Sequence, residues 1–178
     1  DITTLIKDEK AFSETIDQIV ERSNKFSFDK IAAIESRGFV FASAVSYILN
    51  KPFIMLRKKN KLPADVHSVD FELEYGTATI EVHKDSFNKN ENILVIDDLI
   101  ATGGTAEAAA KLIELSGGKV AGFIFIINLF DLPGNNDIDW MSQFIPGEIP
   151  DWIKELESAS EREEMMEVTA RGTGCLGL

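Results

Sequence analysis

The residues best suited to chemistry lie in one run near the middle of the chain. It reads Asp97, Asp98, Leu99, Ile100, Ala101, Thr102, Gly103, Gly104 and Thr105. Glycines between a strand and a helix let successive backbone N–H groups point into one concavity, which suits a phosphate. The threonine hydroxyls and the positive end of a following helix add to such an anion site. The two carboxylates would repel a phosphate, so they need another partner, such as vicinal sugar hydroxyls with a divalent metal nearby.

A second candidate site is basic. Arg57, Lys58, Lys59 and Lys61 place four cations within five residues of a chain whose net charge is -12. One interpretation of this cluster is a solvated surface loop. The other is a site for a polyanion such as pyrophosphate, which needs several cations and N–H donors, and Arg37 would add a bidentate cation.

Both candidate sites follow short apolar runs that are typical of buried strands. Runs at 31–34, 53–56, 93–96 and 120–127 predict four strands. Apolar spacing at 3–22, 38–49 and 105–116 predicts helices, and Gly117 and Gly118 end the last of these. The alternation predicts an α/β domain with a central parallel sheet flanked by helices. Ligands bind at the carboxyl ends of the strands in such sheets, where the run from Asp97 lies.

Two segments depart from this alternation. Residues 69–75 and 77–82 alternate apolar and polar residues around Gly76, which predicts a small antiparallel pair inserted between parallel strands. Residues 151–167 hold seven acids and two bases and predict a solvated amphipathic helix. We therefore expect one domain over 1–134 and an acidic, partly helical extension over 135–178.

Composition limits the classes of function. A net charge of -12 argues against a nucleic-acid-binding protein, which needs a positive surface. Apolar runs are too short to cross a membrane, which takes roughly 18 residues. Cys175 is the single cysteine of the chain, which excludes an internal disulfide and favours a cytoplasmic location.

The run from Asp97 to Thr105 resembles the phosphoribosyl pyrophosphate (PRPP) motif of the type I phosphoribosyltransferases. Three further segments resemble the adenine phosphoribosyltransferases: Glu35-Ser36-Arg37-Gly38-Phe39, Arg57-Lys58-Lys59-Asn60-Lys61-Leu62-Pro63 and Leu73-Glu74-Tyr75-Gly76. The resemblance covers about residues 1–134 in collinear order. It implies a type I phosphoribosyltransferase fold, in which an antiparallel β hood with a flexible loop, here about 57–82, closes over the reacting centre.

The resemblance also implies an activity: transfer of the 5-phosphoribosyl group from PRPP to adenine in purine salvage, which gives AMP and pyrophosphate. It implies a homodimer and Mg²⁺ as cofactor, bound through PRPP, with Asp97 or Asp98 as the candidate to reach the ion through water. Asp97 and Asp98 would hold the ribose hydroxyls. The 5′-phosphate would be held by Ala101, Thr102, Gly103, Gly104 and Thr105.

Further roles follow from the same resemblance. Pyrophosphate would be bound by Ser36, Arg37, Arg57, Lys58 and Lys61, with a cis peptide bond between Glu35 and Ser36. Glu74, Tyr75 and Arg57 would take part in catalysis, and Leu129 would pack on the adenine ring. From spacing alone, Glu74 equally fits a solvent-facing strand residue.

Two alternatives remain beside adenine transfer. One is an enzyme for a 6-oxopurine, which places a Lys near the end of the next strand, whereas no Lys lies between Lys119 and Lys154 here. The other is a non-enzymatic regulator that binds PRPP or a nucleotide, which usually adds a DNA-binding domain or loses the hood. The family also carries a Phe-Arg-type pair before the position of Asp1, so we expect an incomplete N-terminus.

Overall fold

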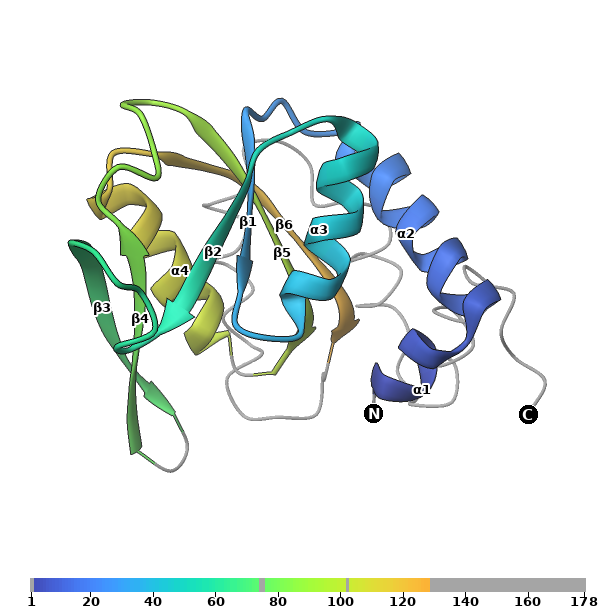
Figure 1. The fold of residues 1–178 in the computed structure, drawn as a ribbon, viewed down its shortest axis with the longest axis horizontal. Helices are drawn as coiled ribbons and strands as arrows, with labels where there is room; N and C mark the ends of the chain where they lie inside the picture. Colours follow the sequence, from blue (N-terminus) through green and yellow to red (C-terminus); the bar gives the residue numbers. More distant parts are fainter. Residues whose placement is uncertain (1, 74–75, 102, 129–178) are drawn as a thin grey trace.

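The computed structural model describes residues 2–73, 76–101 and 103–128. Its helices are α1 (Ile2–Lys7), α2 (Glu9–Ser23), α3 (Gly38–Leu49) and α4 (Gly104–Leu115). Its strands are β1 (Lys30–Ile34), β2 (Phe53–Lys58), β3 (Val66–Leu73), β4 (Gly76–His83), β5 (Asn92–Ile100) and β6 (Lys119–Asn128), as Figure 1 shows. Each apolar run chosen from the sequence therefore lies in a strand.

The strands form one sheet in the order β3-β4-β2-β1-β5-β6. The four strands predicted from apolar runs are parallel to one another, which confirms the expected central sheet. The antiparallel pair predicted around Gly76 is β3 and β4, and β4 also pairs with β2 through Arg57↔Glu81 and Lys58↔Ile80. The hood is thus a continuation of the central sheet beyond β2.

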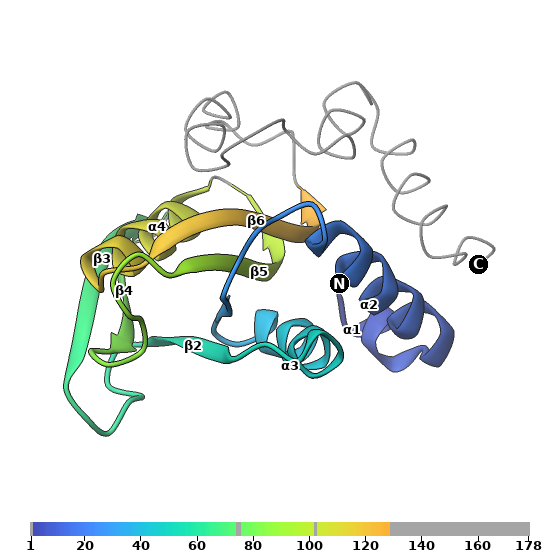
Figure 2. The same cartoon turned by 90° about the horizontal axis from the view of Figure 1, so that it is seen from above.

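Helices cover both faces of the sheet, which Figure 2 shows from above. One buried cluster lies under α4, where Ala106, Ala108, Ala109 and Ala110 are nearly inaccessible to water and allow a close approach to the strands. A second cluster lies under α2 and α3, around Phe41. Among the described residues, no helix combines the length and the apolar character needed to span a membrane.

The helix predicted over 3–22 is interrupted at Asp8. This residue is extended (φ -92°, ψ 117°), and its side chain accepts a hydrogen bond from the Ala11 N–H at 2.8 Å. Aspartate is favoured at such an N-cap, because its carboxylate satisfies one of the free N–H groups of the first turn. The same residue therefore separates α1 from α2.

Candidate active site

Three loops meet at one edge of the sheet. They follow β2, β1 and β5, which are neighbours in the sheet and parallel, so their carboxyl ends point the same way (Figure 1). The loops contain the residues from Glu35 to Arg37, the basic residues after Arg57, and the turn before α4. The fold therefore brings the candidate phosphate site and the candidate polyanion site together.

The two acids are inside β5 rather than after its end. The apolar run stops at Ile96, but the strand continues to Ile100 because Leu99 and Ile100 pair with β6. Asp97 is 9% exposed and Asp98 is 4% exposed. The strand thus holds both carboxylates rigidly, with little contact with bulk water.

Burial raises the pKa of Asp97 from 3.8 to about 7, and the charge of the adjacent Asp98 acts in the same direction. The Asp98 N–H, which donates to Asp97 Oδ1 at 2.9 Å, and the Arg37 charge oppose this rise. Asp97 is therefore harder to ionise than an ordinary aspartate, because its carboxylate is shielded from water and lies beside a second acid.

Arg37 contacts these acids from the start of α3. Its Nε donates a hydrogen bond to Oδ2 of Asp98, and the two side chains form an ion pair. The Glu35–Ser36 peptide bond just before it is cis, as the resemblance implied. Arg37 remains 61% exposed at its side chain, so one side of the guanidinium faces solvent at the edge of the sheet.

Gly38 allows α3 to begin this close to β5. A Cβ at position 38 would lie 2.7 Å from Asp97 Oδ1 and 2.9 Å from the Ile96 carbonyl oxygen. Both distances are shorter than real Cβ contacts, so a larger residue would displace the acid or the helix. Gly38 is thus a site residue that sequence reasoning named only as part of a motif.

The basic loop is held by two acids. Glu35 accepts hydrogen bonds from Arg57 Nε at 3.0 Å and from the Lys58 N–H at 2.8 Å, and the bond from Arg57 lowers the pKa of Glu35. Glu81 accepts from the Asn60 N–H at 2.9 Å. The side chains of Lys58 and Lys61 are exposed. The structure therefore pairs the arginine with an acid and leaves the lysine side chains facing solvent.

The turn before α4 has the conformation that its glycines predicted. Gly103 is left-handed (φ 82°, ψ -14°), a region that residues with a Cβ rarely adopt. It stands at the N-cap of α4 without a side-chain hydrogen bond to the first turn. Helix N–H groups in this position can bind an anion. Ala101, Gly104 and Thr105 are partly exposed around it.

Some predicted site residues lie outside the described residues: Glu74, Tyr75, Thr102 and Leu129, together with the extension at 135–178. Their roles stay predictions.

The structure brings two further acids to the site, Glu35 and Glu81, which the sequence indicated only weakly. Glu35 adjoins the Ser36-Arg37 turn, and Glu81 is an acid between two apolar residues of an alternating strand.

The described residues contain no group of three or more His, Cys, Asp or Glu side chains that could hold a metal. Asp97 and Asp98 supply two carboxylates, which suits Mg²⁺ only if other ligands complete its shell. Phosphate oxygens and water are the usual source of those ligands. The donor set therefore fits a Mg²⁺ ion that arrives with a phosphorylated substrate.

The site combines two acids late in β5, a glycine turn into α4 and a basic loop after β2 of a largely parallel sheet. These features together define a type I phosphoribosyltransferase. A model of the phosphoribosyl transferase domain matches residues 3–159. The adenine phosphoribosyltransferase of Pelagibacter ubique is 74% identical over 138 residues, which are 78% of this chain and 79% of the relative. The chain belongs to the adenine phosphoribosyltransferase family.

Solved structures agree with this assignment. The adenine phosphoribosyltransferase of Thermoanaerobacter pseudethanolicus superposes with a TM-score of 0.74 at 44% identity, over 78% of this chain and 81% of that one. The enzyme of Saccharomyces cerevisiae, in a complex that contains adenine, has a TM-score of 0.70 at 31% identity, over 76% of this chain and 80% of that one. The fold predicted from the sequence is thereby confirmed.

Proposed function

We propose that the edge formed by β1, β2 and β5 binds PRPP and adenine, where the chain carries out the reaction of its family. This reaction transfers the 5-phosphoribosyl group to adenine and releases pyrophosphate. The observation that carries the proposal is the contact between Arg37 and Asp98, late in the strand that leads to the left-handed turn at Gly103. It joins a cation to the acid pair a few residues before a turn whose free N–H groups suit an anion.

In this proposal, the 5′-phosphate sits in the turn at 101–105, where Thr102 and Thr105 add hydroxyl donors. Asp97 and Asp98 accept hydrogen bonds from the two ribose hydroxyls. The burial of both acids in β5 supports this arrangement, because the strand holds the two carboxylates in fixed positions. The acids then orient the sugar so that its anomeric carbon faces the base.

The departing pyrophosphate is stabilised by Ser36, Arg37, Arg57, Lys58 and Lys61. The exposed lysine side chains support this role, since they can turn toward a polyanion without breaking an ion pair that the structure records in its described part. Mg²⁺ bound to PRPP supplies further neutralising charge. The carbon that reacts has oxocarbenium character, so positioning and charge stabilisation contribute most of the acceleration.

Glu74 and Tyr75, together with Arg57, complete the catalytic set, and the hood excludes water that would hydrolyse PRPP. Support comes from β3 and β4, which form the antiparallel pair of the hood. Leu129 follows β6 directly and packs on the purine ring.

The role of Glu74 can be tested by substitution. Changing Glu74→Gln should slow single-turnover chemistry while the PRPP dissociation constant stays within about threefold.

We also propose a homodimer whose interface includes the outer face of α3. Val40, Tyr47 and Ile48 on that helix are 38%, 88% and 51% exposed, and Met55 on β2 is 43% exposed. Large apolar side chains exposed together on one helix favour burial against a partner. Light scattering should give twice the chain mass, and Tyr47→Asp should shift the equilibrium toward monomer. A wild-type chain that is monomeric at micromolar concentration would contradict this arrangement.

A cytoplasmic location completes the proposal, with no nucleic acid or membrane among the partners. The net charge of -12 and the single cysteine support it. Separating the compartments of the source cell and assaying each for the protein would test the location directly.

The decisive experiment measures pyrophosphate release from PRPP with adenine, hypoxanthine and guanine. A site for adenine must present hydrogen-bond acceptors, such as backbone carbonyls, to the 6-amino group of the base. The 6-oxo group of hypoxanthine or guanine placed against those carbonyls leaves both oxygens unpaired, and such a mismatch can reject an analogue by about 10⁴-fold. We expect adenine to be preferred in kcat/KM by at least about 100-fold. Equal rates with hypoxanthine would refute the base assignment, and no turnover with any purine would refute the enzymatic assignment.

A further inference from the structure

Glu81 is a buried acid with no role in the reaction described so far. It lies on β4 between Ile80 and Val82 and is 6% exposed. Carboxylates are rarely buried to this degree unless a hydrogen-bond donor satisfies them. Its recorded donor is the backbone N–H of Asn60, which lies 2.9 Å from Oε2.

Asn60 belongs to the basic loop and is left-handed, with φ at 64°. The amide before it, that of Lys59, donates to the Thr79 carbonyl of β4 at 3.2 Å. The amide of Lys58 donates to Glu35 at 2.8 Å. Three successive amides of the loop are therefore each held by an acceptor, and two of those acceptors lie on β4.

This arrangement fixes the backbone and leaves the cationic side chains outside. Lys58, Lys59 and Lys61 are exposed, whereas the acids beneath the loop are largely buried. A loop that is already ordered loses less conformational entropy when it binds a ligand than a free loop does. The acceptors under the loop thus prepare its cations for a polyanion.

We propose that Glu81 is a positioning residue for pyrophosphate recognition, which acts by holding the Asn60 amide and thereby the cations of the basic loop. The proposal rests on the proposed function, in which these cations bind the pyrophosphate group of PRPP. Glu81 does not touch the substrate. Its effect is therefore expected mainly in the KM for PRPP, with a smaller loss in kcat because the same cations also stabilise the departing pyrophosphate.

The kinetic test compares two substitutions. Glu81→Leu removes the acceptor but keeps an apolar side chain of similar size, and we expect the KM for PRPP to rise at least about tenfold. With both substrates saturating, kcat should fall by a smaller factor than the KM rises. Glu81→Gln retains an oxygen that can accept from Asn60, so its KM for PRPP should stay within about threefold of the wild-type value.

Ile113→Val, in the core under α4 and away from the loop, is the matched control for lost stability. It should lower the melting temperature and leave the KM for PRPP unchanged. The proposal is overturned if Glu81→Leu keeps a normal KM, if Glu81→Gln is as impaired as Glu81→Leu, or if Ile113→Val raises the KM equally at the same loss of melting temperature.

A second measurement needs no activity, and its decisive part uses the wild-type protein alone. In the wild-type protein, the Asn60 amide should exchange with deuterium at least about tenfold more slowly than an open loop amide. Where Glu81→Leu folds, trypsin should cleave after Lys59 and Lys61 several times faster than in wild type. Exchange of Asn60 at the rate of an open amide would overturn the proposal even if the enzyme is fully active. Lack of turnover with a protected Asn60 would instead refute only the function.

Discussion

Arg37 and Asp98 are 61 residues apart in the sequence, yet Nε of Arg37 donates a hydrogen bond to the Asp98 carboxylate. The side chain of Arg37 is 61% exposed and that of Asp98 is 6% exposed. The ion pair therefore connects an exposed cation with a buried carboxylate of β5. It also joins the start of α3 to β5, next to the close approach at Gly38. One contact therefore sets both the charge and the geometry of the site.

Removing the charge of both acids should disable substrate binding. The double substitution Asp97→Asn with Asp98→Asn should raise the KM for PRPP and lower kcat/KM by at least about 100-fold, because the ribose hydroxyls lose their charged acceptors and Arg37 loses its ion-pair partner. Steady-state kinetics measures this. Asp17→Asn, an exposed acid on α2, is the control and should behave as wild type. Near-normal turnover in the double variant would remove the acids from the site.

A methyl group at position 38 should damage the site through sterics alone. In Gly38→Ala, the new Cβ would meet Asp97 Oδ1 at 2.7 Å and the Ile96 carbonyl at 2.9 Å, so the acid or α3 must move. We expect kcat/KM for PRPP to fall at least about tenfold. Gly118→Ala, whose Cβ would lie 3.0 Å from Ile113 Cγ2, is the control away from the site. It should lose stability only, and an equal kinetic effect in both variants would contradict the argument.

The turn before α4 should not tolerate a branched residue. Gly103→Val puts a branched side chain on a residue whose φ is 82°, which strains the turn. The side chain also prevents a phosphate from approaching the backbone. Calorimetry should detect no binding of AMP or PRPP. Gly117→Val is a matched control, since Gly117 has φ 93° beyond the other end of α4 and should lose stability but keep AMP affinity. Unchanged AMP affinity in a folded Gly103→Val protein would exclude the turn as the phosphate site.

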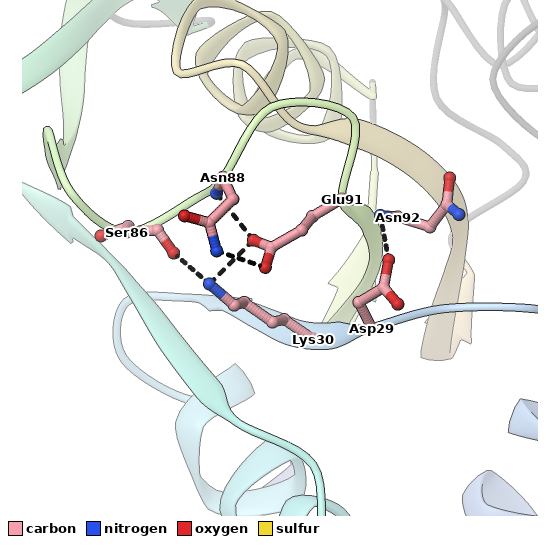
Figure 3. Close-up of polar contacts among 6 residues, drawn as sticks. All are labelled: Asp29, Lys30, Ser86, Asn88, Glu91 and Asn92. Atoms are coloured by element: carbon pink, nitrogen blue, oxygen red, sulfur yellow. Dashed lines mark hydrogen bonds and ion pairs between the residues drawn. The ribbon is translucent and has the colours of Figure 1, made fainter.

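The amino ends of β1 and β5 are joined by a second polar cluster, shown in Figure 3. Lys30 Nζ donates to the Ser86 carbonyl at 2.9 Å and pairs with Glu91 at 2.8 Å, while Asn88 donates to Glu91 from its backbone and its side chain. Partial burial raises the pKa of Glu91, but these hydrogen bonds outweigh it and lower the pKa from 4.5 to about 2.

Because the folded state lowers this pKa, the carboxylate stabilises the protein fully above pH 4.5, and the stabilisation is lost as the pH falls toward 2. Glu91→Gln should lower the free energy of unfolding by about 1–3 kcal/mol at pH 7. Urea unfolding at pH 7, 5 and 3.5 should show the difference from wild type shrinking at the lowest pH. Glu114→Gln, on the exposed side of α4, should show no difference at any pH. A pH-independent deficit in Glu91→Gln would contradict the assignment.

Several features of this protein are determined by its sequence alone. Short apolar runs mark the inner strands of a parallel sheet, so the existence of β1, β2, β5 and β6 could be predicted, although β5 extends four residues beyond its apolar run. The turn at Gly103 could be predicted because glycines between an apolar strand and a helix favour a left-handed turn. The interruption at Asp8 was missed, since the apolar spacing of a helix continues across it and only the backbone shows the N-cap.

Other features were decided by the tertiary structure. The contact of Arg37 with Asp98, that of Arg57 with Glu35, and the support of Asn60 by Glu81 each join residues on different strands or loops. Alternation along β4 assigns Glu81 to a solvated face, yet the loop after β2 folds over it and buries it. Such contacts depend on the order of strands in the sheet and on the paths of the loops, because a local pattern records which face a side chain occupies but not what covers that face.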